Sequence, residues 1–203
     1  MQSEDGLDLV RGERTILETA LQDFLEAHQV GNSSPNTIDS YSRILRAFVD
    51  WLHNAHKLTY VDQLRIKHLR GYVLYLQKRP SERGSALSDT TIHHYALVVS
   101  VFCHWLEHEG LIEKSVVDHF DLPKFEQREI PALTRDDLQK LLDACDEGYK
   151  KRSRLRKALA SRNRAIISLL FDAGIRRSEL IGLRLGDIDR DLRLLHIRRK
   201  GGK

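Results

Sequence analysis

The stretch SPNTIDSYSRILRAFVDWL, residues 34–52, decides the architecture of the first part of the chain. It returns 54 positions later as SDTTIHHYALVVSVFCHWL, residues 88–106. The positions kept in both copies are Ser34, Thr37, Ile38, Tyr41, Phe48, Trp51 and Leu52, matched by Ser88, Thr91, Ile92, Tyr95, Phe102, Trp105 and Leu106. The apolar members recur at helical spacing, and a serine stands where an N-cap belongs. We therefore predict two similar helices that pack their aromatic stripes into one small bundle.

The opposite faces of these two helices carry polar side chains that such a core does not need. An exposed polar face is most often merely solvated, but it is also available to a partner. The positions predicted to face outward are Asn36, Arg43, Arg46, Thr90, His93 and His94.

Further helices are predicted on either side of the repeat. Apolar spacing and turn residues place them at residues 14–29, 61–78, 138–145 and 165–173, with a short strand at 194–199 and a turn at Gly201-Gly202. Thr134 with Asp137 forms an acidic variant of a capping box before the helix at 138–145. The chain is thus divided into a disordered start, a helical domain, a proline-containing linker and a second domain, at residues 1–13, 14–118, 119–133 and 134–203.

Composition excludes several classes of protein. The 203 residues contain 41% hydrophobic residues, enough for a core, and no apolar run approaches the ~18 residues of a membrane span. The acidic start has no signal-peptide pattern, so a cytoplasmic location is expected. Only Cys103 and Cys145 are present, which leaves no disulfide framework and no four-cysteine zinc site.

Charge is distributed unevenly along the chain. Residues 1–130 hold 14 Lys and Arg against 19 Asp and Glu, whereas residues 131–203 hold 19 against 10. The run from Lys150 to Arg164 has eight basic residues and no acidic one; it includes Lys150, Lys151, Arg152 and Arg154. Such a run can be a solvated face. It also suits phosphate-backbone binding, so nucleic acid is the leading partner.

The sequence supports neither a zinc peptidase motif nor the motifs of nucleotide and ester hydrolases. His104 and His108, with Glu107 between them, match an H-x-x-E-H zinc motif. No third ligand is evident, and the repeat places these histidines on an outer helix face, so we expect no metal. The chain also lacks a phosphate-binding P-loop and a G-x-S-x-G elbow, which argues against nucleotide hydrolysis and α/β-hydrolase chemistry.

The stretch AGIRRSELIGLRLGDID, residues 173–189, carries the strongest candidate for chemistry. Gly174 suits a helix C-cap, and Arg176 and Arg177 follow after one intervening residue. A guanidinium at such a junction can grip a phosphate bidentately. Glu179 lies three residues after Arg176, close enough on a helix to orient it. On chemistry alone, an ordinary charged helix junction is the favoured explanation of these residues.

Three segments of the chain resemble parts of one protein family and occur in the same order as in that family. AGIRRSELIGLRLGDID with LLHIRRKGGK resembles the first catalytic motif and following β-hairpin of tyrosine recombinases, the phage-integrase and Xer-like family. SPNTIDSYSRILRAFVDWL resembles their core-binding domain, and EIPALTRDDLQKLL the start of their catalytic domain. The resemblance implies a mainly α fold: an N-terminal helical bundle (a SAM-like core-binding domain) followed by the first part of a mixed α/β catalytic domain.

The resemblance also implies an activity. Tyrosine recombinases bind double-stranded DNA, assemble as tetramers on paired sites, and transfer strands through a 3′-phosphotyrosyl intermediate without metal or nucleotide cofactor. By position in the motif, Arg176 resembles the first catalytic arginine and Glu179 the acidic residue that supports it. Lys200 resembles the catalytic lysine, and Arg177 is expected to contact the DNA backbone or solvent.

The nucleophile of such an enzyme is not found where the family pattern would place it. All six tyrosines precede Arg176: Tyr41, Tyr60, Tyr72, Tyr75, Tyr95 and Tyr149. The family's His-x-x-Arg motif and tyrosine follow the lysine hairpin, so residues 1–203 alone are expected not to cleave DNA. Two alternatives remain open: a non-catalytic DNA-binding protein, and a regulator that uses residues 165–185 as a helix-turn-helix.

Overall fold

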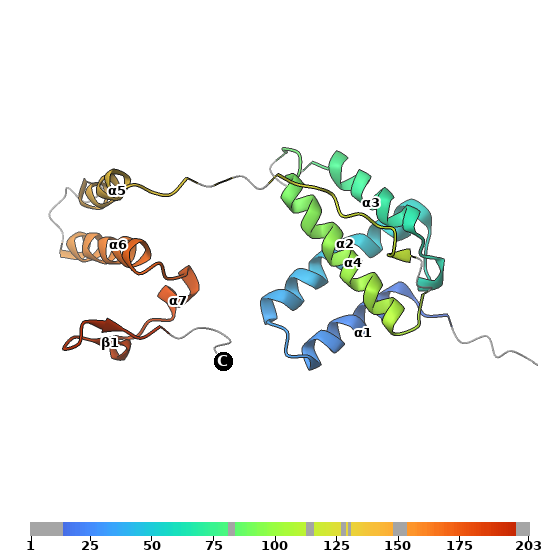
Figure 1. The fold of residues 1–203 in the computed structure, drawn as a ribbon, viewed down its shortest axis with the longest axis horizontal. Coiled ribbons are helices and arrows are strands. Elements are labelled where there is room, and N and C mark those ends of the chain that lie inside the picture. Colours follow the sequence, from blue (N-terminus) through green and yellow to red (C-terminus); the bar gives the residue numbers. More distant parts are fainter. Residues whose placement is uncertain are drawn as a thin grey trace, which may run out of the picture. The chain divides into compact units, whose positions relative to one another are not determined.

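The chain forms two compact units, residues 1–128 and 129–203 (Figure 1). The computed structural model describes residues 14–80, 84–112, 116–126, 129, 131–147 and 154–197. The boundary between the units falls inside the predicted linker. The predicted disordered start, residues 1–13, lies outside the described residues.

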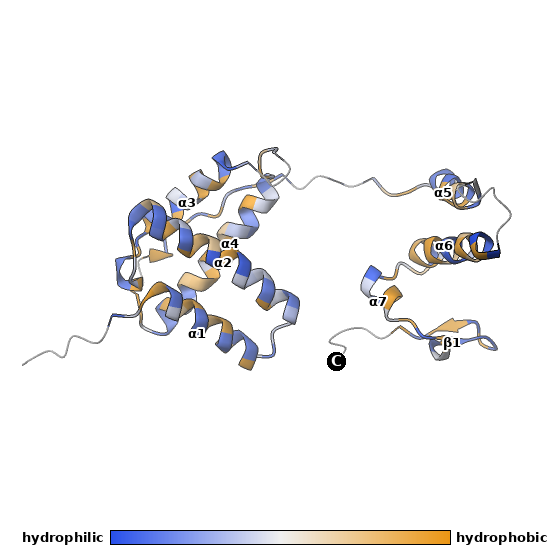
Figure 2. Ribbon diagram, turned by 180° about the vertical axis from the view of Figure 1, so that it is seen from behind, coloured by the Kyte–Doolittle hydropathy of each residue, from blue (hydrophilic) through white to orange (hydrophobic). Residues whose placement is uncertain are grey.

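The first unit is a helical bundle, as the family resemblance implies. Its elements are α1 (Leu17–Val30), α2 (Pro35–His56), the 3₁₀ turn η1 (Val61–Gln63), α3 (Ile66–Lys78) and α4 (Asp89–His108). Each α-helix directs an apolar stripe into one shared core, and the side chains with no exposed surface include Leu17, Phe24, Ile44, Leu45, Phe48, Leu52, Leu64, Leu76, Phe102 and Leu106. The polar residues lie outward, which makes these helices two-coloured in Figure 2.

The two copies of the internal repeat begin with the same cap. Ser34 Oγ accepts a hydrogen bond from the backbone N–H of Thr37 at 3.2 Å, and Ser88 Oγ accepts one from Thr91 at 3.2 Å. In both copies the two hydroxyl groups also lie within hydrogen-bond distance of each other. The predicted pair of similar helices is therefore confirmed at the level of individual atoms.

The aromatic stripes of the repeat also match. Phe48 and Trp51 stack with ring centroids 6.4 Å apart and planes 16° apart, and Phe102 and Trp105 do so at 6.3 Å and 11°. Phe24 of α1 meets the second pair edge-on, 5.3 Å from Phe102 and 5.6 Å from Trp105. The aromatic side chains thus belong to the core, as predicted.

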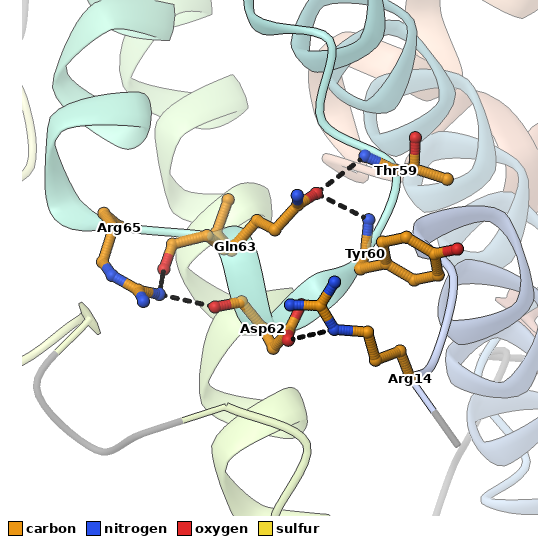
Figure 3. Close-up of polar contacts among 7 residues, drawn as sticks. Arg14, Thr59, Tyr60, Asp62, Gln63 and Arg65 are labelled. Carbon is orange, nitrogen blue, oxygen red and sulfur yellow. Dashed lines mark hydrogen bonds and ion pairs between the residues drawn. The ribbon is translucent and has the colours of Figure 1, made fainter. Parts of the chain in front are cut away.

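The segment before α3 departs from the single helix predicted over residues 61–78. Gln63 Oε1 accepts hydrogen bonds from the backbone N–H groups of Thr59 and Tyr60, at 3.0 and 3.1 Å, and closes the 3₁₀ turn η1 before α3 begins (Figure 3). The guanidinium of Arg14 lies 5.1 Å from the centre of the Tyr60 ring. A side chain that binds its own upstream backbone competes with the helix, which explains the break.

The second unit contains three helices and a short hairpin among its described residues. They are α5 (Arg135–Glu147), α6 (Arg154–Asp172), α7 (Arg177–Ile181), the 3₁₀ turn η3 (Leu185–Asp187), β1 (Ile188–Asp189) and β2 (Leu194–Leu195). Helices α5 and α6 start earlier than predicted, and α6 takes in the described end of the basic run. The capping box is confirmed, because Asp137 Oδ2 accepts hydrogen bonds from the hydroxyl and backbone N–H of Thr134 while Thr134 Oγ1 accepts one from the Asp137 N–H.

The hairpin of the second unit lies upstream of the predicted turn. Strand β2 pairs antiparallel with β1, so the predicted strand at 194–199 is the second strand of the described hairpin. Asp189 Oδ1 accepts the N–H groups of Asp191 and Leu192, which closes the connection. Gly201-Gly202 lies outside the described residues. Among the described helices, none is long and apolar enough to cross a membrane.

Candidate functional site

Arg176 stands at the junction between α6 and α7. Gly174 has a φ of +59°, a left-handed conformation that glycine adopts without strain. Ile175 is buried and anchors the chain, and Arg176 follows in an extended conformation as the N-cap of α7. The glycine and the buried isoleucine therefore fix where this arginine leaves the backbone.

Glu179 orients Arg176 by two contacts, as its spacing predicts. Its Oε2 accepts the backbone N–H of Arg176 at 2.8 Å, and its Oε1 lies 3.3 Å from Nη1 of the guanidinium. The Glu179 side chain is 11% exposed, whereas that of Arg176 is 77% exposed. A carboxylate fixed against the protein thus steers a cation whose remaining N–H groups face solvent, an arrangement suited to an incoming phosphate.

The contact between a carboxylate and the backbone N–H of an arginine three residues before it occurs again eight residues further along the chain. Asp187 Oδ2 accepts the backbone N–H of Arg184 at 2.8 Å, and the Asp187 carbonyl accepts the N–H of His196 at 2.8 Å. Asp187 is 5% exposed, a buried acid that ties η3 to the hairpin. Asp187 is not among the site residues predicted from the sequence. The signal was present, because Arg184 and Asp187 repeat the spacing of Arg176 and Glu179.

The basic run is only partly described. Lys150, Lys151, Arg152 and Lys200 lie outside the described residues. Arg154 and Arg177 are exposed at the starts of α6 and α7. At the other end of the run, Arg164 is already engaged: its Nη1 lies 2.7 Å from Asp146 Oδ2 and 3.3 Å from the Leu142 carbonyl.

Most predicted outward positions of the repeat are exposed. The side chains exposed to solvent on α2 and α4 include those of Asn36, Arg46, Thr90 and His94. Arg43 is exposed too, and its Nη1 donates a hydrogen bond to the hydroxyl of Tyr95 at 3.4 Å, linking α2 to α4.

His93 differs from the other predicted positions. It is half-buried, its Nδ1 lies 2.7 Å from the Pro123 carbonyl, and its ring centre lies 4.6 Å from that of Phe125. The prediction of a free outward side chain is wrong for this residue. A segment thirty residues further along the chain folds back onto it, which helical spacing alone does not reveal.

Comparisons with known proteins assign both units. Residues 21–110 match the family model "Phage integrase, N-terminal SAM-like domain", and residues 131–203 match the "Phage integrase family" model. Tyrosine recombinase XerD of Halalkalibacterium halodurans is 29% identical over 184 residues, which cover 90% of this chain and 57% of the relative. Tyrosine recombinase XerC of Pseudomonas syringae pv. tomato is 31% identical over 170 residues, covering 84% and 52%. The chain belongs to the tyrosine recombinase family.

This tyrosine recombinase chain spans about half the length of the curated relatives it matches, from 52 to 59%. Among solved structures, the N-terminal domain of a phage integrase/site-specific recombinase from Haloarcula marismortui is 18% identical, covers 54% of this chain and 98% of that chain, and has a TM-score of 0.46. That score is too low to bear on the fold.

The alternative motifs have local structural roles in this recombinase chain. His104 Nδ1 donates to the Ser100 carbonyl at 2.9 Å, and His108 lies 3.3 Å from Glu109 Oε1. Across the described residues, no group of three or more His, Cys, Asp or Glu side chains could hold a metal ion. Helix α7 has only five residues, which is too short for the recognition helix of a helix-turn-helix.

Three buried titratable groups belong to the core of the first unit, away from Arg176 in the sequence. Burial lowers the pKa of His68 to about 4, and the nearby charge of His56 contributes. Burial raises the pKa of Tyr72 and that of Cys103 well above their ordinary values. These three side chains are therefore neutral at pH 7, and their function is in packing.

Proposed function

We propose that this chain supplies the DNA-binding domain and part of the strand-transfer site of a site-specific tyrosine recombinase. In the whole protein, tetramers on paired sites would cleave and rejoin duplex DNA through a 3′-phosphotyrosyl intermediate. The observation that carries the proposal is the exposed Arg176 guanidinium oriented by the largely buried Glu179. The family match supports it over both units.

The proposed chemistry needs cations placed before the reaction begins. Negative charge accumulates on the scissile phosphate in the transition state, and a preorganised donor there contributes ~3 kcal/mol. Arg176 is oriented by two contacts with Glu179, so little rearrangement is required when the phosphate arrives. Lys200, which the motif places on the following hairpin, would protonate the departing 5′-oxygen as general acid.

Residues 1–203 by themselves are proposed to bind DNA without cleaving it. No tyrosine follows Arg176, and Tyr41, Tyr72 and Tyr95 pack in or against the core of the first unit. Binding would use the exposed faces of α2 and α4 together with the basic run. Because residues 1–130 are acidic overall, binding there depends on a local face and not on net charge.

A cleavage assay on the full-length protein tests the catalytic part. Arg176→Ala and Lys200→Ala should each lower strand cleavage by about 100-fold or more and leave DNA affinity nearly unchanged. Arg190→Ala removes an exposed arginine from the hairpin turn and serves as the matched control. Wild-type cleavage in either of the first two variants would contradict the assignment.

The salt dependence of affinity tests the DNA-binding part. Replacing Lys150, Lys151, Arg152 and Arg154 by glutamine should weaken binding on all sequences alike. Each lost phosphate contact flattens the plot of log K against log salt by about 0.9. The control is Arg14→Gln, since Arg14 is already paired with Asp62 at 3.0 Å. An unchanged slope in the quadruple variant would refute a phosphate-binding role for the run.

A further inference from the structure

We propose that His93 is a positioning residue: it fastens a strap, residues 116–126, to the first unit and thereby sets where the chain departs towards the second unit. The inference rests on the proposed function in one respect, that both units bind the same DNA. The predicted role of His93 as a free DNA contact is replaced by this one.

The strap is attached at its beginning by burial and by a hydrogen bond to α3. Val116 and Val117 are 3% and 5% exposed, and Phe120 packs against the core. Arg70 Nη2 of α3 donates to the carbonyl of His119 at 3.2 Å. The predicted linker at 119–133 therefore begins with residues that are part of the folded first unit.

The end of the strap is attached to α4 by two contacts with His93. The Pro123 carbonyl can only accept a hydrogen bond, so the proton must be on Nδ1 of His93, which donates across 2.7 Å. Phe125 lies beside the same ring at 4.6 Å with the planes 57° apart. One imidazole thus supplies both a polar and an aromatic contact.

The path of the strap determines where the chain leaves the first unit. The chain leaves α4 at its C-terminal end and runs back beside the helix until Pro123 reaches His93, in the second turn of α4 (Figure 1). A helix of 20 residues is ~30 Å long. The exit point is therefore moved along α4 to the end that carries Thr90 and His94, the residues proposed to meet DNA.

The strap also shortens the connection between the units. Eight residues, 127–134, separate its end from the start of α5 at Arg135. A chain of that length spans at most ~28 Å. Release of residues 121–126 would extend the connection to fourteen residues and ~49 Å. The second unit would then search a larger volume, and its effective concentration at DNA bound by the first unit would fall about twofold.

Trypsin cleavage after Lys124, in residues 1–203 without DNA, tests the attachment. Lys124 is exposed but lies between the two residues that His93 holds, so cleavage requires the strap to detach. His93→Ala should raise the cleavage rate several-fold. The matched control is His94→Ala, because His94 is exposed on the same helix turn and makes neither contact. Equal rates in the two variants would overturn the proposal.

A substitution in the strap itself distinguishes release of the strap from a general loss of stability of the first unit. Phe125 is 39% exposed, so Phe125→Ala should fold normally and still raise cleavage after Lys124. His93→Asn keeps a donor near the Nδ1 position and should restore part of the protection. A wild-type rate in Phe125→Ala would contradict a role for the ring contact.

DNA affinity tests the consequence for positioning. His93→Ala and Phe125→Ala should each lower the affinity of residues 1–203 for duplex DNA about twofold. If the strap is released but affinity does not change, the positioning role is refuted. If residues 1–203 bind no DNA at all, the proposed function fails, and the proteolysis result still decides whether His93 fastens the strap.

Discussion

The two units of this chain have similar helices but bury very different amounts of apolar surface. All but two of the buried apolar side chains in the described residues belong to the first unit, and the two exceptions are Ala160 and Ile175. In the second unit, Leu185, Ile181 and Leu192 are 84%, 71% and 68% exposed. Figure 2 shows apolar residues on α6 and β1, and Leu155, Leu170 and Ile188 among them are 68%, 38% and 45% exposed.

The difference teaches which interactions maintain each unit. Burial of apolar surface is the main favourable term in folding, and the first unit has a shared core of interlocking aromatic rings. The second unit relies more on local polar contacts: the Thr134 cap, the Arg176 and Arg184 boxes, and the ion pair of Arg164. Its part of the candidate site is therefore built on elements with a smaller core.

The largest expected effect is a core truncation in the first unit. Phe48 has no exposed surface, so Phe48→Ala should lower the free energy of unfolding by about 3–5 kcal/mol. Leu185→Ala in the second unit should cost less than about 0.5 kcal/mol. Urea unfolding followed by tryptophan fluorescence measures the first effect, since both tryptophans, Trp51 and Trp105, lie in the first unit. If circular dichroism showed that Phe48→Ala and Leu185→Ala lower the free energy of unfolding equally, the comparison between the two units would be refuted.

Acid should weaken the first unit before the second. The folded pKa of His68 is about 4 and its ordinary value is 6.5, so the unfolded chain binds the proton first as pH falls. The stabilisation is complete above pH 6.5 and is lost towards pH 4, on the order of 3 kcal/mol. In the second unit, hydrogen bonds from Thr134 depress the pKa of Asp137. The stability that the Asp137 carboxylate contributes is therefore lost only when the pH falls below the ordinary pKa of 3.8.

The control for this pH dependence is His68→Asn. Its side-chain oxygen can still accept the Arg65 N–H that His68 Nδ1 accepts at 3.0 Å, but it does not titrate. Stability of this variant, followed by tryptophan fluorescence, should be flat between pH 6.5 and pH 4. A slope equal to that of the wild type would show that another group is responsible.

Removal of a helix cap should lower the free energy of unfolding by a smaller amount, and the effect should differ between the two units. Ser34→Ala and Ser88→Ala should each cost about 1 kcal/mol, because each removes one side-chain acceptor from a helix start. Thr134→Ala removes a cap of the same kind in the second unit. It should reduce the helical signal in circular dichroism without moving the fluorescence midpoint, and a shift of that midpoint would mean that the units unfold together.

The smallest effect is expected at Tyr72. Its hydroxyl oxygen is buried and, within the described part of the chain, has no hydrogen-bond partner. Tyr72→Phe should therefore leave the free energy of unfolding unchanged or raise it by up to about 1 kcal/mol. Tyr95→Phe is the comparison, since the Tyr95 hydroxyl accepts a hydrogen bond from Arg43. A marked loss of stability in Tyr72→Phe would reveal a partner for that hydroxyl.

Local spacing predicted part of the candidate site and missed the rest. The contact of Glu179 with Arg176 and the capping box of Thr134 with Asp137 each join residues three apart, so the sequence indicates them directly. The hairpin of β1 and β2 is not indicated by turn residues in the sequence, because its turn contains no glycine and is closed by the Asp189 side chain.

The sequence by itself determined the helices of the first unit apart from the break before α3, the equivalence of α2 and α4, and the membership of a recombinase family. Apolar periodicity and caps act within a few residues, and a repeat preserves them in both copies. Only the tertiary structure decided that His93 fastens the strap and that Ile181 of α7 and Leu192 of the hairpin stay exposed. These features depend on which distant segments meet, and contact over thirty residues leaves no periodic signal in the sequence.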